Sequence, residues 1–406
     1  MTTEMAFAAA QTTEQNLPSA LDALLAQLSA RLGDLTTPPI DLAVVFLTPH
    51  FVHDAPFISQ YLHQNLSPTT LLGCAGQGVI GQHEIEDIPA ITLIAGRLPN
   101  VQLTPFALQP PDWQEFIDNP IMLDAELPVS NSPELILLLA DPFSVPIVEL
   151  LDLFNVRFHG VPVVGGMVSA AAYANGNVLF FNDLLLSRGA IGVALSGDLT
   201  AEVIVSQGCR PIGQPLRVTQ CHQNFLMRLN DEPPLAYIQS LYNQLPITDR
   251  LLMQTGGLYL GRAIHNDPDQ LGRGDFVVRG VMGMDPESGA IAIGDVLHPG
   301  EYVQFHLRDA TTATEDLEMM LAPQAFSAAP RAALLFNCNG RGQRLYNRPN
   351  GDVTVIHDSL GDDLPLAGFF CAGEIGPIGS QNLLHSHTAS LVLLRPRRTT
   401  ARTNAG

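Results

Sequence analysis

The chain has 406 residues and a formal net charge of −20, from 20 basic and 40 acidic side chains, and every basic residue is an arginine. Without lysine the chain forms neither a Schiff base nor a P-loop, and its acidity disfavours a nucleic-acid partner. At about 100–200 residues per domain, the length predicts two domains or three small ones, each able to bury a core.

The cysteines and the apolar runs indicate the compartment. The five cysteines are widely spaced, odd in number and without a C-x-x-C pair, which is typical of reduced thiols. No uninterrupted apolar run approaches about 18 residues, and the first residues lack the basic segment of a signal peptide. We therefore expect an acidic, soluble, cytoplasmic protein without membrane insertion.

Apolar periodicity predicts the elements of the N-terminal part. Residues 1–16 are small and polar, which predicts a frayed terminus. A helical spacing runs from Leu17 to Leu32 and stops at Gly33. The next predicted elements are a buried strand at 42–47, a helix around 57–64, a strand at 69–76 that ends in glycine, and strands at 90–95 and 102–107.

The same order of elements then recurs. A second copy comprises a strand at 135–140, a helix at 145–158, a strand ending in glycine at 161–166, and strands at 178–181, 190–195 and 201–205. A third comprises strands at 332–336, 366–373 and 389–394. The recurrence predicts an internal strand–helix–strand repeat, with a chance recurrence in an α/β chain as the alternative.

The segment between the second and third copies has a different pattern. Strand-like runs at 276–284, 290–293 and 301–307 are separated by turn residues and predict a β meander. We predict an α/β fold of two mixed-sheet domains with internal strand–helix–strand repeats, the C-terminal one including the meander. The expected divisions are an N-terminal tail and helix at 1–35, domains at 36–213 and 214–394, and a disordered tail at 395–406.

Residues 76–81, GQGVIG, match the G-x-G-x-x-G pattern of dinucleotide-binding loops. Such a site also requires a helix that begins within the motif and an acidic residue about 20 positions later. Here no apolar helical stripe follows before Pro89, and Gly96 occupies the acidic position. We therefore interpret these glycines as a tight turn or a close approach of another backbone.

Three cysteines stand near predicted strand ends. Cys74 and Cys371 are expected to occupy matching places in two repeats, just past the strand glycines Gly73 and Gly368. Cys338 lies in the turn Asn337–Gly342, NCNGRG. Each thiol is a nucleophile if a histidine lowers its pKa, or otherwise a small buried apolar residue. The turn presents backbone N–H groups and Arg341, which favours an anionic ligand, unless it is a solvated surface turn.

Glu374 and the histidines are the remaining candidates. Glu374 lies among glycines and apolar residues, where a carboxylate is either desolvated in a ligand pocket or paired with an arginine. Neither His385 and His387 nor His50 and His53 have the spacing of a strong zinc site, and no G-x-S-x-G motif occurs. We expect no metal site and no enzymatic activity.

Four segments resemble one family. Residues 71–81 (LLGCAGQGVIG) resemble the N-terminal half of the FIST sensory domain, and 276–309, 337–346 (NCNGRGQRLY) and 364–377 (LPLAGFFCAGEIGP) resemble its C-terminal half. The resemblance covers about residues 36–394. It implies a small-ligand-binding sensory protein, with an amino acid or a related metabolite as ligand. Because no output domain is recognisable, we expect it to act in trans on a signalling partner.

Two alternatives remain open. Some relatives of this family are haem-containing nitric-oxide sensors, so the resemblance allows a haem held by an axial histidine. A cysteine-dependent enzyme is the further alternative.

The predicted site is a cleft where strand-ending glycine turns of both halves meet. Arg341 would hold a carboxylate of the ligand and Glu374 an amine. The expected ligand-binding residues are Gly73, Cys74, Gly165, Gly166, Asn337, Cys338, Arg341, Cys371 and Glu374.

Overall fold

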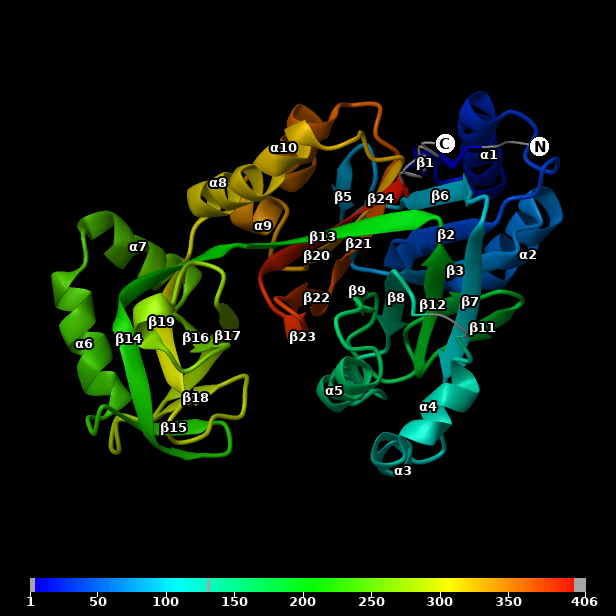
Figure 1. Cartoon of the computed structure of the whole chain (residues 1–406). Coiled ribbons are helices and arrows are strands. Elements are labelled where there is room, and N and C mark those ends of the chain that lie inside the picture. The colour runs from blue at the N-terminus through cyan, green and yellow to red at the C-terminus, as the bar shows by residue number, and fades with distance from the viewer. Residues whose placement is uncertain (1–3, 130–131, 398–406) are drawn as a thin grey trace, which may run out of the picture.

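A computed structural model describes residues 4–129 and 132–397. It contains three six-stranded mixed sheets, which form one large body, and a separate closed barrel (Figure 1). The predicted α/β class with mixed sheets is confirmed.

The large body consists of three copies of one chain path, so the predicted repeat is confirmed. The first copy is β1 (Ala6–Thr12), α1 (Leu17–Leu32), β2 (Leu42–Leu47), α2 (Ala55–Leu66), β3 (Thr70–Ala75), the hairpin β4 (Gly78–Ile80) and β5 (Glu84–Glu86), and β6 (Ile91–Arg97). The second is β7 (Val101–Leu108), α3 (Trp113–Asp118), α4 (Pro120–Glu126), β8 (Leu135–Ala140), α5 (Ile147–Arg157), β9 (Val163–Met167), β10 (Leu179–Phe181), β11 (Leu184–Leu186) and β12 (Ala190–Gly197). The third is β13 (Leu199–Gln207), α8 (Ala310–Leu321), β20 (Ala332–Cys338), α9 (Gln343–Tyr346), α10 (Gly351–Leu360), β21 (Leu366–Cys371), β22 (Glu374–Ile378), β23 (Gln381–His385) and β24 (Thr388–Pro396).

Each sheet has the same strand order, and each borrows a hairpin from another copy. The orders are β1-β6-β2-β3-β10-β11, β7-β12-β8-β9-β22-β23 and β13-β24-β20-β21-β4-β5. The first sheet therefore receives the hairpin of the second copy, the second that of the third, and the third that of the first. This cyclic exchange relates the copies by a pseudo-threefold arrangement and interlocks them.

Each copy contains a pair of parallel strands: β2 and β3, β8 and β9, and β20 and β21. Glycines occupy equivalent positions in the later strand of each pair. A Cβ atom would lie 2.1 Å from the Val45 carbonyl oxygen if added to Gly73, and 1.8 Å from that of Leu138 if added to Gly165. At Gly368 it would lie 1.8 Å from the Leu335 carbonyl oxygen. Only glycine permits this close approach of the parallel neighbours β2, β8 and β20.

This register corrects one expectation about the cysteines. Since Gly73, Gly165 and Gly368 are equivalent, Cys74 corresponds to Gly166 and Phe369, whereas Cys371 lies two positions further along its strand. The two cysteines therefore do not occupy matching places. They share only the face of the sheet that points to the central core.

The inner faces of the three sheets meet in that core. Phe46 of β2 stacks on Phe369 of β21 with ring centroids 5.2 Å apart, and Phe336 of β20 packs edge-on against both. Helices cover the outer faces through separate apolar clusters. The nearly continuous apolar strands follow from this burial on both sides.

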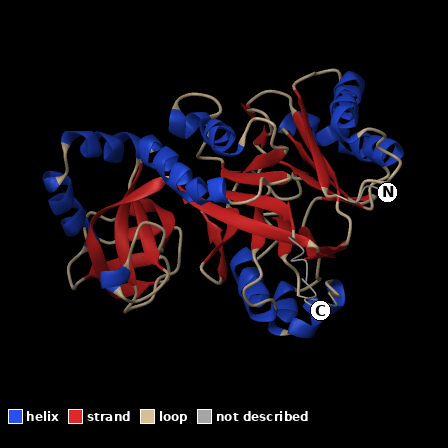
Figure 2. Ribbon diagram, turned by 45° about the horizontal axis from the view of Figure 1, so that its top comes forward, coloured by secondary structure: helices blue, strands red, loops and turns tan. Residues whose placement is uncertain are grey.

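The predicted meander belongs to the closed barrel, which is inserted between β13 and α8 of the third copy. Its elements are β14 (Cys209–His222), β15 (Phe225–Leu229), α6 (Pro234–Gln244), α7 (Ile247–Gly256), β16 (Tyr259–Ala263), β17 (Phe276–Met284), β18 (Ile291–Ile293) and β19 (Tyr302–Arg308), in the order β14-β15-β18-β17-β16-β19. Figure 2 shows these strands as a body apart from the three sheets. The expected boundary at residue 213 falls within β14.

Both termini are more ordered than expected. Residues 6–12, predicted to fray, form β1 antiparallel to β6, because Ala8 and Ala10 are buried against α1 and neighbouring strands. Of the expected tail at 395–406, Arg395 and Pro396 complete β24, and residues 398–406 lie outside the described residues.

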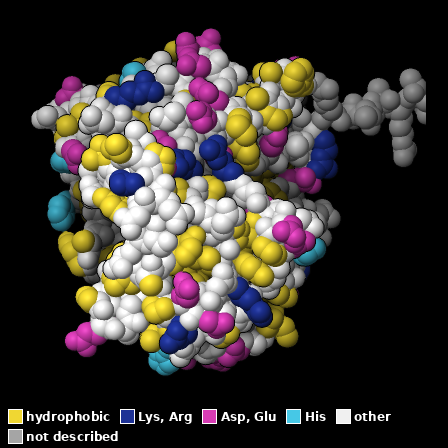
Figure 3. Space-filling view, turned by 90° about the vertical axis from the view of Figure 1, so that its left-hand side faces the viewer, with side chains coloured by type: hydrophobic (Ala, Val, Ile, Leu, Met, Phe, Trp, Pro, Cys, Tyr) yellow, Lys and Arg dark blue, Asp and Glu magenta, His cyan; other side chains and the backbone are white. Residues whose placement is uncertain are grey.

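The helices and the charged surface concern two possible partners, a membrane and a nucleic acid. None of the helices in the described residues is long and apolar enough to cross a membrane. Figure 3 views the molecule from the barrel side and shows basic side chains scattered among apolar and acidic ones. That no nucleic acid binds stays a prediction.

Candidate functional site

A cluster of buried and half-buried polar side chains lies where the barrel joins the third copy. We call it the junction cluster: Arg308 of β19, Asn337 and Cys338 at the end of β20, Arg341, Glu374 at the start of β22, and His387. Segments far apart in sequence meet here because β20, β21 and β24 are adjacent strands and β19 leads directly into α8. The sequence predicted four of these residues but neither Arg308 nor His387.

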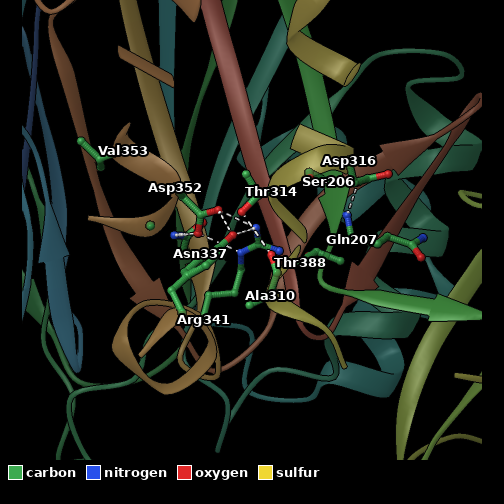
Figure 4. A network of polar contacts seen from close by, with 12 residues as sticks. Ser206, Gln207, Ala310, Thr314, Asp316, Asn337, Arg341, Asp352, Val353 and Thr388 are labelled. Carbon is green, nitrogen blue, oxygen red and sulfur yellow. Dashed lines mark hydrogen bonds and ion pairs between the residues drawn. The ribbon is translucent and has the colours of Figure 1, made fainter. Parts of the chain in front are cut away.

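Arg341 is not free to hold a ligand carboxylate, which corrects its expected role. Its side chain is 1% exposed and forms a two-point ion pair with Asp352 of α10, with Nε–Oδ2 at 2.9 Å and Nη2–Oδ1 at 2.5 Å. Tyr346 accepts a further hydrogen bond from Nη2 at 2.8 Å, and Asn337 donates to Asp352 (Figure 4). The buried guanidinium is thus already neutralised, as burial requires.

The hairpin of the first copy fixes this pair in place. Glu84 of β5 is buried and accepts hydrogen bonds from the backbone N–H groups of Gly351, Asp352 and Val353, at 3.2, 2.8 and 3.0 Å. These are N–H groups of the first turn of α10, which have no partner within the helix. The carboxylate of one copy therefore positions a helix of another, a contact that sequence spacing does not reveal.

Several groups of the cluster lack partners. Four of the five buried side-chain polar atoms without a hydrogen bond in the described residues are Arg308 Nη2, Asn337 Oδ1, Glu374 Oε1 and His387 Nδ1. Burying a polar atom without a partner costs about 1–3 kcal/mol, so such a concentration is unusual. Arg308 also forms no ion pair with any described acidic residue.

Gly340 shows that three of the groups surround one point. A Cβ atom added there would lie 3.2 Å from His387 Nδ1, 3.5 Å from Cys338 Sγ and 3.7 Å from Arg308 Nη2. The Cys338 thiol in turn interacts with the Glu374 carboxyl. The absent side chain of Gly340 therefore leaves the polar groups of the barrel and the third copy facing each other.

Burial raises the pKa of Glu374 to about 8, against the opposing effect of two hydrogen bonds from Thr388. Those bonds, from the backbone N–H at 3.0 Å and the hydroxyl at 2.8 Å, both reach Oε2. At neutral pH this carboxyl is therefore mostly protonated and can become an anion when a cation approaches.

Arginines of the barrel act on His387. Burial lowers the pKa of His387 to about 4, and the positive charges of Arg308, Arg279 and Arg341 lower it in the same direction. His387 is accordingly neutral, adopts a left-handed backbone (φ 63°) and packs edge-on against Tyr259 with centroids 4.6 Å apart. Arg308 and Arg279 both come from barrel strands.

The thiols are unsuited to act as nucleophiles at neutral pH. Burial raises the pKa of Cys338 to about 12, with a contribution from Glu374. Burial also raises the pKa of Cys74 and Cys371 well above the usual value. All three are protonated thiols.

The remaining predicted residues lie in strands around the central core. Gly73, Cys74 and Gly165 are buried in the strands around the central core. Gly166 pairs with Glu374 in the second sheet, and its Cα faces Cys371, whose Sγ would lie 2.3 Å from an added Cβ. The structure therefore brings Asn337, Cys338, Arg341 and Glu374 together, with Gly166 and Cys371 beside them.

The three histidines nearest the junction cluster are occupied by the protein itself. His306 and His385 each hydrogen-bond a backbone carbonyl at 2.9 Å, and His387 is packed against Tyr259. In the described part of the chain, no three histidine, cysteine or acidic side chains are grouped as metal ligands.

Comparison with known families assigns the chain to a class of sensory protein. The FIST N domain matches residues 41–232 and the FIST C domain matches residues 235–377. The chain belongs to the FIST family, whose domains are associated with small-ligand binding in sensory signalling. The boundary between the two matches lies inside the barrel.

Similar proteins include two mycobacterial relatives. The uncharacterized protein Rv0628c of Mycobacterium tuberculosis is 37% identical over 332 residues, which is 81% of this chain and 84% of the relative. The uncharacterized protein Mb0898c of Mycobacterium bovis is 37% identical over 333 residues with the same coverage. A solved cyanuric acid hydrolase from A. caulinodans covers 97% of this chain and 100% of its own at 8% identity, with a TM-score of 0.36, which supports no inference.

Proposed function

We propose that this FIST protein is a non-enzymatic sensor that binds an α-amino acid, or a closely related small metabolite, in the junction cluster. In this proposal Arg308 holds the carboxylate and Glu374 the amine. One observation carries it: Arg308 Nη2, Glu374 Oε1 and His387 Nδ1 are buried without partners in the same cluster. An arginine, a carboxyl group and a neutral imidazole complement the two ends of a zwitterion.

The connections of the barrel support a sensory role. The chain enters the barrel at Gly208 and leaves it at Asp309, and the Asp309 N–H donates to the Gly208 carbonyl at 3.2 Å. The Gly208 N–H in turn donates to the carbonyl of His387 at 2.9 Å. A ligand that contacts Arg308 and His387 therefore acts directly on both connections. In this proposal it changes the barrel's position and so the surface offered to a partner in trans.

Binding should release a proton. Glu374, with its pKa near 8, is mostly neutral at pH 7 and must ionise to hold an ammonium group. Calorimetry in buffers of different ionisation enthalpy measures this release.

The test is calorimetric titration of the full chain with the standard amino acids. We expect one or a few to bind, and Arg308→Ala and Glu374→Gln each to weaken binding about 10- to 100-fold, because each removes a charged hydrogen bond. Arg308→Lys should retain part of the affinity. The matched controls Arg348→Ala and Glu318→Gln alter exposed side chains outside the cluster and should bind as the wild type does.

Two results would contradict the proposal at different points. If no amino acid or amino-acid derivative bound, the ligand class would be wrong. If one bound with the same affinity to both cluster variants, the site would be wrong. A haem absorbance band in the purified protein would instead favour the gas-sensor alternative.

A further inference from the structure

A cavity lies at the end of the three-copy body where the parallel strands of all three copies end, and neither Arg308 nor Glu374 lines it. Its volume is about 610 Å³. None of the nine residues predicted from the sequence lines it. It is large enough for a small-molecule ligand.

The lining residues come from equivalent positions of the three copies. Val45, Leu138 and Leu335 of β2, β8 and β20 face the equivalent glycines, and the residues four positions later are Pro49, Pro142 and Asn339. The residues four positions after the glycines of β3, β9 and β21 are Gln77, Ser169 and Ala372. All six line the cavity, so it lies on the pseudo-threefold axis.

Hydrogen bonds between copies hold the polar members of this set. The backbone N–H of Gln77 donates to Ser169 Oγ at 2.9 Å, and that hydroxyl donates to the Phe370 carbonyl at 2.5 Å. In the amide orientation that satisfies both ends of the group, the Asn339 side-chain nitrogen donates to the carbonyls of Phe370 (3.0 Å) and Cys371 (3.3 Å). Its oxygen then faces the end of the Gln77 side chain, 3.2 Å from Gln77 Oε1. The site is thus built by all three copies and is preorganised.

The chemistry of the lining is neutral and partly aromatic. Gln77, Ser169 and Asn339 offer amide and hydroxyl groups, and the Phe143 ring is 46% exposed at the wall. The charged or titratable members are the exposed Asp87 and His50, and no arginine lines the cavity. An anion would therefore meet a carboxylate without a compensating guanidinium.

From this lining we infer that the axial cavity is a second ligand site, which takes a small, uncharged, planar ring molecule bearing amide-type donors and acceptors. The ring stacks on Phe143 and lies against Pro49 and Pro142, while its edge bonds the amides of Gln77 and Asn339. This inference does not depend on the amino-acid site, because the two sites share no lining residue.

The test uses saturation-transfer NMR on the full chain with three uncharged probes, nicotinamide, uracil and adenine. Nicotinate and 1-methylnicotinamide serve as the anionic and cationic forms of the same ring. We expect at least one neutral probe to bind, nicotinate to bind at least tenfold more weakly than nicotinamide, and Phe143→Ala or Gln77→Ala to weaken the bound probe about tenfold. Phe57→Ala is the matched control, since Phe57 is 47% exposed and lies outside the cavity.

The outcomes separate this inference from the proposed function. Arg308→Ala should leave the neutral probe bound, and Phe143→Ala should leave amino-acid affinity unchanged. The inference would be overturned if none of the three neutral probes bound. It would also be overturned if Phe143→Ala and Gln77→Ala bound the probe with the same affinity as the control Phe57→Ala. Preferential binding of 1-methylnicotinamide would overturn the uncharged class and indicate a cation site at Asp87.

Discussion

Arg308 and Arg341 lie in the same cluster but differ in what neutralises their charge. Arg341 is locked to Asp352 by two contacts, so its role is to position the end of β20 and α10. Arg308 meets no acidic side chain of the described chain, and one of its nitrogens is buried without a partner. Because a buried polar atom without a partner is costly, this nitrogen supports the proposal that Arg308, rather than Arg341, holds an anionic ligand group.

The pKa of Glu374 makes stability depend on pH. Folding raises it from 4.5 to about 8, so the folded protein holds one proton that the unfolded chain releases between these values. The stabilisation is fully present below pH 4.5 and is lost as pH rises through 8. Urea unfolding at pH 5 to 8 should therefore show the wild type losing about 1.4 kcal/mol per pH unit relative to Glu374→Gln.

Using Glu374→Gln as the reference cancels the contributions of the other titrating groups. Parallel pH profiles for the two proteins would show that the Glu374 carboxyl is ionised in the folded state, contrary to its burial.

At the scale of elements, hairpins rather than helices join the copies. The β4–β5 hairpin belongs to the first copy but pairs with β21 of the third and brings Glu84 to the start of α10. The glycines that resemble a dinucleotide loop serve this hairpin: an added Cβ at Gly78 would lie 2.7 Å from the Ile85 carbonyl oxygen. The expected close backbone approach is thereby confirmed.

Removing the Glu84 carboxylate should destabilise the third copy. Glu84→Ala leaves three N–H groups at the start of α10 without their acceptor, and we expect a loss of about 2–4 kcal/mol in the free energy of unfolding. Faster hydrogen exchange in α10 should accompany it. Glu318→Ala, an exposed glutamate of α8, is the control. An unchanged unfolding free energy would mean that water replaces the carboxylate.

At the scale of the whole molecule, the interlocked copies and the barrel are distinct units. Each sheet contains a hairpin from another copy, so no copy retains its complete sheet if another unfolds. The barrel has its own apolar core and joins the large body through Gly208 and Asp309. The junction cluster lies at these connections, so a ligand bound there, as proposed, would contact both units.

Native-state hydrogen exchange should resolve these units. We expect amides in β2, β8 and β20 to exchange with free energies within about 1 kcal/mol of each other, because the copies open together. Amides in β16 and β17 should exchange at a separate, lower free energy. Independent exchange of one copy would contradict the interlocking.

The sequence by itself determined the local elements and their repetition. Runs such as 42–47 and 135–140 are apolar because both faces of each sheet are buried, and Gly33 ends α1 as its position predicts. The family resemblance also rested on local motifs, and the family is confirmed.

Only the tertiary structure decided which residues face each other. Nothing near Arg341 in sequence marks Asp352 as its partner, and Arg308 and His387 meet only because the barrel returns to the third copy at Asp309. The exchange of hairpins, the closure of the barrel and the axial cavity likewise depend on contacts between segments far apart in the chain. Apolar periodicity records which face of an element is buried, but not what covers it.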